Sequence, residues 1–296
     1  MIFRLSLILI LLLLTYYNNI RCNLFKFFIY ALTAGLIINF ISFFIFRGIN
    51  IDEDGRFSGT LSNSNILAII GVFSIFFYSL YVQNSEKKSA FLFTVFLGIS
   101  LFLIMATGSR KGLVLGSFIT LFSIRSFAQK QKQYYFILLV LLPVLLLYII
   151  QSGFSENIIA VERLQESFSF FKTGEGDSST KWRLHFIDTA YNVFRENMAF
   201  GVGIDAFQHF TTLGQYAHNN YLEILADLGV IGFLLYYSIY FPIIVKAIKQ
   251  RKNGIFVAMI IAILIMEVAV VTYYTRIFWI FMFFFYEKLS IHKKKK

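Results

Sequence analysis

Three arginines and one histidine are the residues of this chain best suited to chemistry. Arg56, Arg110, Arg183 and His218 all lie in polar stretches between long apolar runs. Arginine offers planar, permanently charged donors that fit phosphate oxygens, and histidine is the usual proton acceptor near neutral pH. Taken singly, an exposed arginine is more often solvated or near lipid headgroups, and a lone histidine is more often a helix cap. Together on one membrane face, the four would suit a diphosphate.

The setting of His218 supports a functional interpretation. The stretch FGVGIDAFQHFTTLGQYAHNNYLEILADLGVIG, residues 200–232, is polar and glycine-rich up to Ala217 and apolar afterwards. Apolar residues then recur at helical spacing, which predicts a membrane helix over residues 218–245. We expect His218 and Asn219 on the first turn of this helix, where unpaired backbone N–H groups attract anions.

The composition restricts the fold class to membrane proteins. Hydrophobic residues make up 58% of the 296 residues, and 37 are phenylalanine, which is far more apolar surface than a soluble domain uses. We therefore expect an all-α polytopic membrane protein. The single cysteine excludes an internal disulfide and a cysteine-based metal site. The histidines and carboxylates lack the spacing of metal ligands, so we predict neither a metal nor a cofactor.

Apolar runs predict about nine transmembrane helices in a single membrane domain, residues 1–296. The expected spans are 1–17, 23–46, 63–83, 89–106, 112–124, 134–150, 218–245, 255–275 and 277–286. A long polar loop, residues 151–217, separates the sixth span from the seventh.

The basic residues predict the orientation of these spans. With the spans above, clusters at 21–26, 87–88, 125–132, 246–252 and 293–296 all fall on one side, which must be the cytoplasm. The loop 151–217 carries more acidic than basic side chains and belongs outside. The net charge of +11 is thus a topology signal and gives no support to nucleic-acid binding. Arg56, Arg110, Arg183 and His218 then share the outer face, and the C-terminus is cytoplasmic.

Four blocks of the sequence resemble the O-antigen ligase and polysaccharide polymerase family in order and spacing. They are GRFSGTLSNSNILA (55–68), TGSRKGLVLG (107–116), RLHFIDTAYNVFRENMAFGVGIDAF (183–207) and AHNNYLEILADLGVIG (217–232). The last two are the most specific, with a glycine-rich turn followed by histidine, asparagine, an aromatic residue and a pair of glycines.

The resemblance implies a metal-independent membrane glycosyltransferase of GT-C type in the bacterial inner membrane. Such enzymes take a glycan from a polyprenyl (undecaprenyl) diphosphate carrier at the outer face and pass it to a sugar hydroxyl. By this resemblance, the catalytic residues are His218, Arg183 and Arg110. Arg56, Arg110, Arg183 and Lys111 would bind the diphosphate, and Asn219, Tyr221 and Trp182 the glycan. Lys181 and His185 are possible helpers.

Three functions remain open at this stage. A repeat-unit polymerase for a capsular or O-antigen-type polysaccharide is favoured, because nothing in the sequence marks a lipid or protein acceptor. A ligase that transfers the glycan from the same carrier to such an acceptor is the alternative. A flippase for the carrier-linked glycan would also need outward arginines, but it should show internal repeats and charges at the bilayer midplane. The partners expected are the carrier-linked oligosaccharide, the bilayer and other polysaccharide-assembly membrane proteins.

Overall fold

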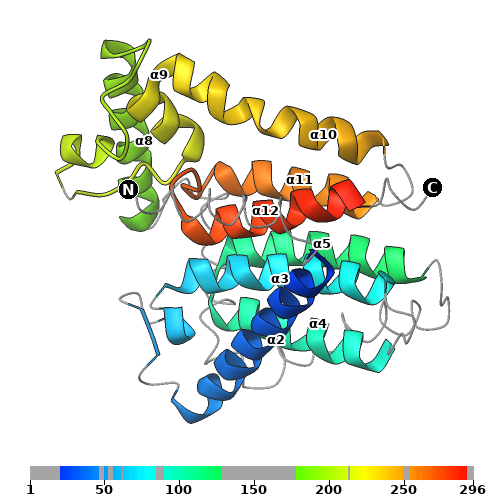
Figure 1. Ribbon diagram of the computed structural model, residues 1–296. Coiled ribbons are helices and arrows are strands. Elements are labelled where there is room, and N and C mark those ends of the chain that lie inside the picture. The colour runs from blue at the N-terminus through cyan, green and yellow to red at the C-terminus, as the bar shows by residue number, and fades with distance from the viewer. Residues whose placement is uncertain are drawn as a thin grey trace. The chain divides into compact units, whose positions relative to one another are not determined.

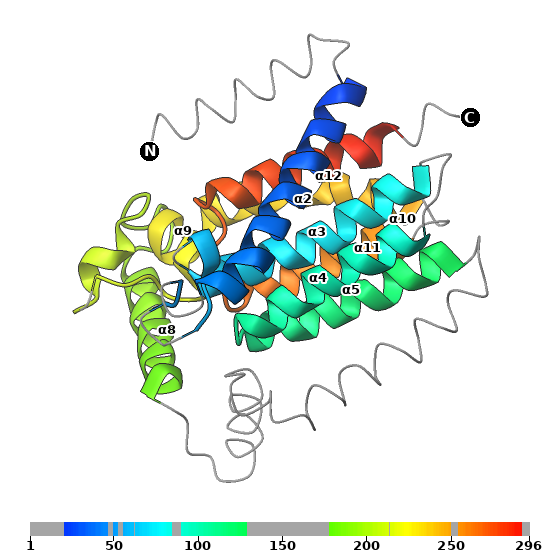
Figure 2. The same cartoon turned by 90° about the horizontal axis from the view of Figure 1, so that it is seen from below.

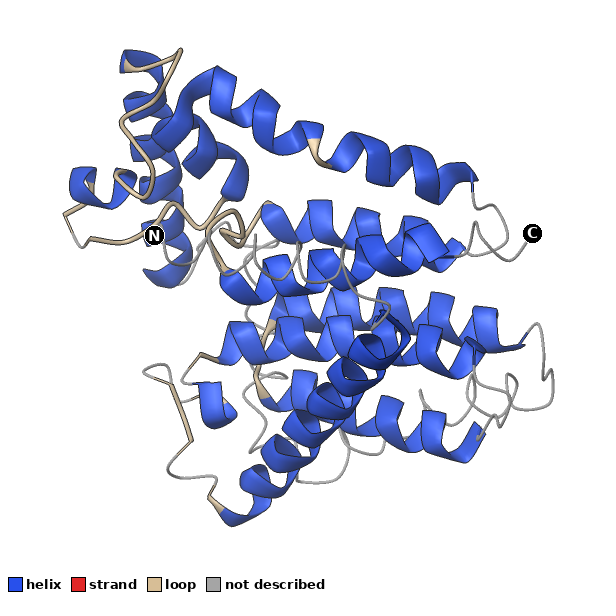
Figure 3. Ribbon diagram, viewed as in Figure 1, coloured by secondary structure: helices blue, strands red, loops and turns tan. Residues whose placement is uncertain are grey.

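A computed structural model describes residues 21–46, 50–52, 56–61, 63–84, 90–128, 178–212, 214–249 and 254–291. Within these ranges the chain is helical, and the only strand-like feature is an isolated bridge between Ile51 and Phe57 (Figure 3). The all-α prediction is confirmed there. The expected spans 1–17 and 134–150 lie outside the described residues.

The chain divides into two compact units. The α2–α5 unit holds Asn19–Thr173 and Asn253–Met259, and the α8–α12 unit holds Met1–Asn18, Gly174–Lys252 and Ile260–Lys296. Helix α11, Gly254–Glu267, thus contributes to both.

The α2–α5 unit packs three helices side by side, with α2 crossing them (Figures 1 and 2). Its elements are α2 (Arg21–Ile45), η1 (Gly59–Leu61), α3 (Ser64–Asn84), α4 (Ala90–Ala106) and α5 (Arg110–Ala128). Glycines allow the close packing, since a Cβ on Gly112 would lie 2.7 Å from the Cβ of Ala68. A hydrophobic core around Phe43, Phe57 and Leu67 joins α2 and α3 to the turn that precedes η1.

The α8–α12 unit is built around a polar helix that packs against the start of an apolar helix. It contains α8 (Ser178–Glu196), η3 (Phe207–Phe210), α9 (Asn220–Ser238), α10 (Tyr240–Lys249), the second half of α11 and α12 (Arg276–Ile291). Ala190 and Val193 of α8, Phe207 of η3 and Ala226 of α9 form one buried cluster. The predicted loop 151–217 therefore contains a 19-residue helix, α8, which was not expected.

Among the described residues, three stretches are long and apolar enough to cross a membrane. They are Leu24–Ile45, Ser64–Gln83 and Asn220–Lys249, and Leu92–Ala106 and Gly254–Glu267 are shorter apolar helices. These helices have the character of an integral membrane protein. The total of about nine spans and the single membrane domain stay predictions.

Two predicted spans differ from the observed helices. The span 255–275 was expected to be continuous, but α11 ends at Glu267, and the chain turns before α12 begins at Arg276. At this point the Glu267 side chain accepts hydrogen bonds from Thr272 within the turn and from three tyrosines that precede α11 in the chain. The span 112–124 is longer than expected, because Ser109 starts α5 at Arg110 and the helix continues to Ala128.

Candidate functional site

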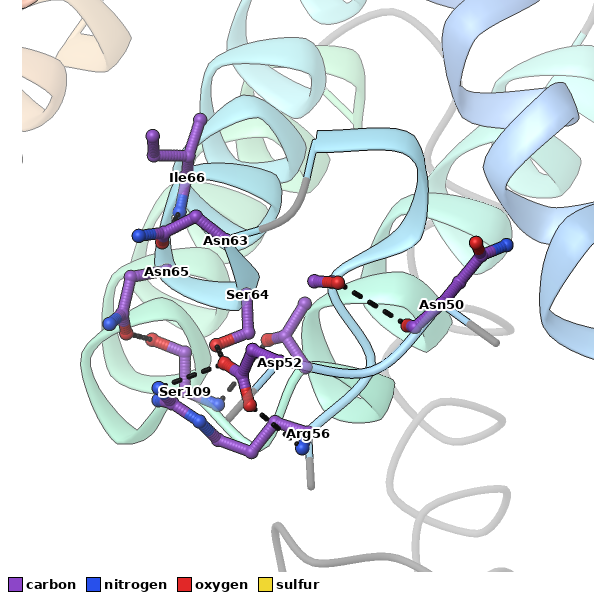
Figure 4. Close-up of polar contacts among 10 residues, drawn as sticks. Asn50, Asp52, Arg56, Asn63, Ser64, Asn65, Ile66 and Ser109 are labelled. Atoms are coloured by element: carbon purple, nitrogen blue, oxygen red, sulfur yellow. Dashed lines mark hydrogen bonds and ion pairs between the residues drawn. The ribbon is translucent and has the colours of Figure 1, made fainter. Parts of the chain in front are cut away.

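Arg56 lies in a tight turn held by Asp52. The guanidinium Nη2 lies 2.9 Å from Asp52 Oδ2, the Arg56 amide donates to Asp52 Oδ1 over 2.9 Å, and Ser64 Oγ donates to Asp52 Oδ2 over 2.6 Å (Figure 4). Burial alone would raise the pKa of Asp52, but the hydrogen bonds from Ser64 and Arg56 and the charge of Arg56 lower it below 3.8. Arg56 is only 8% exposed, so the turn fixes one of the predicted arginines beside the first residue of α3.

Arg110 begins α5 at the same end of the α2–α5 unit. Ser109 caps the helix, since its carbonyl accepts from the amide of Leu113 over 2.9 Å and its Oγ from the amide of Gly112 over 3.3 Å. Ser109 Oγ also donates to Oδ1 of Asn65 in the first turn of α3 (Figure 4). The N-termini of α3 and α5 are thereby tied together, and Arg56, Arg110 and Lys111 gather at one end of the unit.

Helix α8 carries Arg183 and the aromatic and basic residues around it. A pocket of about 610 Å³ is lined by Lys181, Trp182, His185 and Thr212. Trp182 is 47% exposed, and the centroid of its ring lies 5.9 Å from that of the His185 ring, edge to face. An exposed indole beside basic groups can stack on a sugar ring, so the placement of Trp182 suits its predicted role.

His218 precedes helix α9, which corrects the expectation that it lies on the first helical turn. Helix α9 begins at Asn220, and Asn219 is its N-cap, with its Oδ1 accepting from the amide of Leu222 over 3.1 Å. His218 has a φ of 54°, in the left-handed region. Its ring lies 4.1 Å from the ring of Tyr216 and stacks at 6.2 Å on Phe186 of α8. Because Arg183 is three residues before Phe186, it lies on the same face of α8, one turn away.

The glycine-rich FGVG turn, residues 200–203, packs against α9 at the point where that helix is interrupted. Gly229 has φ 65° and ψ −170°, which interrupts the helix. The amides of Val202 and Gly203 donate to the carbonyls of Ala226 and Asp227 over 3.0 and 2.8 Å. In return, Val230 and Ile231 of α9 donate to the carbonyls of Met198 and Ala199. The backbone of residues 198–203 thus forms hydrogen bonds with the N–H and C=O groups that the interruption of α9 leaves unpaired. In apolar surroundings such groups need a partner from the protein.

Three buried carboxylates, Glu223, Asp227 and Glu267, hold segments of the α8–α12 unit together. Asp227 accepts from the amides of Phe207 and Asp205 over 2.7 and 3.0 Å and from the hydroxyl of Tyr273. Burial and the charge of Asp227 raise the pKa of Tyr273, which keeps its hydroxyl protonated as a donor. Asp227 therefore anchors the loop after the FGVG turn and the segment between α11 and α12.

Glu267 is enclosed by hydroxyl groups. Its Oε1 accepts from Tyr240, Thr272 and Tyr236 over 2.7, 2.6 and 2.9 Å, and its Oε2 accepts from Tyr237 over 3.1 Å. Both oxygens are filled, so this buried acid joins α9 and α10 to the end of α11.

Sequence reasoning missed Glu223 and Asp227 as parts of the site. The signal was present, since a carboxylate inside an apolar helix is costly unless it is paired or functional. Asn219 uses its side chain as the helix cap, and the Tyr221 hydroxyl donates to the carbonyl of Leu264 over 2.9 Å. Glycan binding by Asn219 and Tyr221 stays a prediction.

The predicted site residues form two groups. Arg56, Arg110 and Lys111 gather in the α2–α5 unit, whereas Trp182, Arg183, His218 and Asn219 gather in the α8–α12 unit. Among the residues that the structure describes, no three histidine, cysteine or acidic side chains form a group that could hold a metal ion.

Residues 95–237 match the family model described as O-antigen ligase. The matched segment contains Arg110, Arg183 and His218, and Arg56 lies before it. No curated protein matches the chain. The match over residues 95–237 therefore supports the resemblance of this chain to the O-antigen ligase and polymerase family.

Proposed function

We propose that this chain is a membrane glycosyltransferase that polymerises polyprenyl-diphosphate-linked oligosaccharide repeat units. The family supports a polymerase- or ligase-type glycosyltransferase activity, a polyprenyl-linked glycan as substrate, and a membrane setting. The observation that carries the proposal is the placement of His218 in a strained turn at the start of an apolar helix, against the helix that bears Arg183.

The proposed reaction uses these residues in distinct roles. An acceptor sugar hydroxyl attacks the anomeric carbon of the donor glycan, and its proton passes to the His218 imidazole. The bond between that carbon and the carrier diphosphate breaks. Arg183 and Arg110 stabilise the charge that develops on the departing diphosphate, with Arg56 and Lys111 as further contacts. No metal is needed in this scheme, because guanidinium groups supply the positive charge.

The setting that we propose is the bacterial inner membrane, with the reacting residues outside and the C-terminus in the cytoplasm. The polymer would be a capsular or O-antigen-type polysaccharide carried on undecaprenyl diphosphate. Other membrane proteins of polysaccharide assembly would supply the carrier-linked units. The ligase is the second candidate, because the matching family model is described as O-antigen ligase.

A gel of surface glycan from cells that lack this gene separates the two candidates. If the chain is the polymerase, the deletion leaves single repeat units on the final acceptor, and the wild-type gene restores the ladder. If polymer instead accumulates on the lipid carrier, the chain is a ligase. An unchanged ladder would contradict both functions.

Substitutions test the assigned roles in the same cells. Arg110→Ala and His218→Ala should each abolish the polymer without lowering the amount of protein in the membrane. Arg110→Lys should also fail, because an ammonium group lacks the planar, bidentate donors of a guanidinium. His209→Ala and Arg195→Ala are controls, since both side chains are exposed in the α8–α12 unit, which also holds His218, and they should keep the ladder. Wild-type chain lengths with His218→Ala would contradict the assignment.

A further inference from the structure

We infer that Glu223 is a positioning residue whose carboxylate holds the turn that presents His218. The inference rests on the proposed function only for the role of His218. The geometry of the turn can be tested without any knowledge of the substrate.

The contact joins the first turn of α9 to the residue before His218. Glu223 Oε2 accepts a short hydrogen bond from the amide of Ala217. Glu223 and Ala217 are both 0% exposed, and Ala217 belongs to the buried cluster with Ala190 and Phe207. Asn219 fixes the other end of the turn as the helix cap. His218 therefore lies between two anchored residues.

The left-handed conformation of His218 makes this anchoring necessary. A residue with a β-carbon and φ of 54° is strained relative to ordinary backbone. Such strain persists only where neighbouring contacts maintain it. The bond from Ala217 to Glu223 is such a contact, one residue before the strained position. Without it, we expect the turn to relax and the imidazole to leave its place between Tyr216 and Phe186.

Glu223 differs from the two other buried carboxylates of the unit. Both oxygens of Asp227 and both of Glu267 accept hydrogen bonds. Glu223 Oε1 is buried and has no hydrogen-bond partner among the described residues. Burying a carboxylate is costly, and a carboxylate that accepts a hydrogen bond at only one oxygen recovers little of that cost. The one hydrogen bond that the Glu223 carboxylate accepts among the described residues, from the turn at His218, accounts for its position.

This difference predicts opposite results for amide substitutions. In Glu223→Gln, the amide oxygen can still accept from the amide of Ala217. The NH₂ group then takes the place of Oε1, where no donor is displaced. Glu223→Leu removes the acceptor at nearly constant volume. Asp227→Asn serves as the matched comparison, because its NH₂ group must face a backbone or hydroxyl donor, and we expect it to weaken the FGVG loop.

Hydrogen exchange of the purified full chain in detergent micelles tests the turn directly. With Glu223→Leu, the amide of Ala217 should exchange about tenfold faster than in the wild type, the effect of losing about 1.4 kcal/mol. Amides 202 and 203, which bond to α9, should be unaffected. Glu223→Gln should stay within about threefold of the wild type. Unchanged exchange with Glu223→Leu, or equal exchange with both variants, would overturn the inference.

The glycan gel tests the consequence for His218. Glu223→Leu should reduce polymer at least about tenfold at equal membrane abundance, whereas Glu223→Gln should restore the ladder. A full ladder with Glu223→Leu would refute the positioning role even if exchange is faster. If the wild-type gene itself restores no polymer, the proposed function fails, and the exchange rates alone decide whether Glu223 holds the turn.

Discussion

Replacing Gly229 by alanine should destabilise the α8–α12 unit. An added Cβ would lie 2.4 Å from both the carbonyl carbon and the carbonyl oxygen of Ala199. Those atoms belong to the backbone that bonds to α9, so they cannot move aside cheaply. The φ of 65° and ψ of −170° fall in a region open essentially to glycine alone.

The expected cost combines two terms. The backbone conformation costs roughly 1–3 kcal/mol for a residue with a side chain, and the overlap costs roughly 1–3 kcal/mol more. A total on the order of 3 kcal/mol should lower the melting temperature by on the order of 10 °C for a chain of this size. The loss grows if the hydrogen bonds between the FGVG turn and α9 also break.

Thermal unfolding of the detergent-solubilised chain, followed by size-exclusion chromatography after heating, measures this loss. Gly98→Ala is the matched control, because a Cβ there meets nothing within 4 Å and alanine favours the helix. We expect the control to melt at or slightly above the wild-type temperature. A wild-type melting temperature for Gly229→Ala would refute the account of the helix break.

Two further predictions concern buried acids. Glu267→Leu should cost about 2–4 kcal/mol, measured by the same thermal assay, because it leaves the hydroxyls that now donate to the carboxylate without their acceptor; an unchanged melting temperature would contradict this. The pKa of Asp52 is lowered in the folded chain, so its stabilisation of the Arg56 turn is present above the unfolded pKa and is lost as the pH falls below about 4 through the folded value. Hydrogen exchange of residues 50–58, corrected for the intrinsic pH dependence, should show this loosening in the wild type, whereas Asp52→Asn should be loose at every pH.

The helices were predictable where apolar runs are uninterrupted. Composition and hydropathy predict α2, α3 and α4 to within a few residues, because burial in a membrane depends on length and apolarity alone. The same reasoning extended the span 255–275 past Glu267, since hydropathy does not register the hydroxyl groups that bind one carboxylate. Helix α8 was missed because its apolar residues, among them Phe186, Ala190 and Val193, form only one buried stripe on a polar helix.

The candidate site was predictable by residue type and family blocks but not in its supporting contacts. His218 and Arg183 were chosen from their chemistry and from the resemblance, and the structure gathers them in one unit. The left-handed turn at His218 and the contact from Ala217 to Glu223 depend on tertiary packing, which sequence spacing does not encode. The helix break at Gly229 depends on contacts with residues 198–203 that lie about 30 positions away in the sequence.

The most direct test of the central claim is polymerisation by the purified chain in liposomes. The substrate is the lipid-linked oligosaccharide extracted from cells that lack this gene, and the buffer contains EDTA. We predict that the wild type produces a ladder of longer glycans on the lipid carrier, and that His218→Ala at equal abundance produces none. Single repeat units remaining unchanged with the wild type, or a ladder formed equally by His218→Ala, would contradict the account.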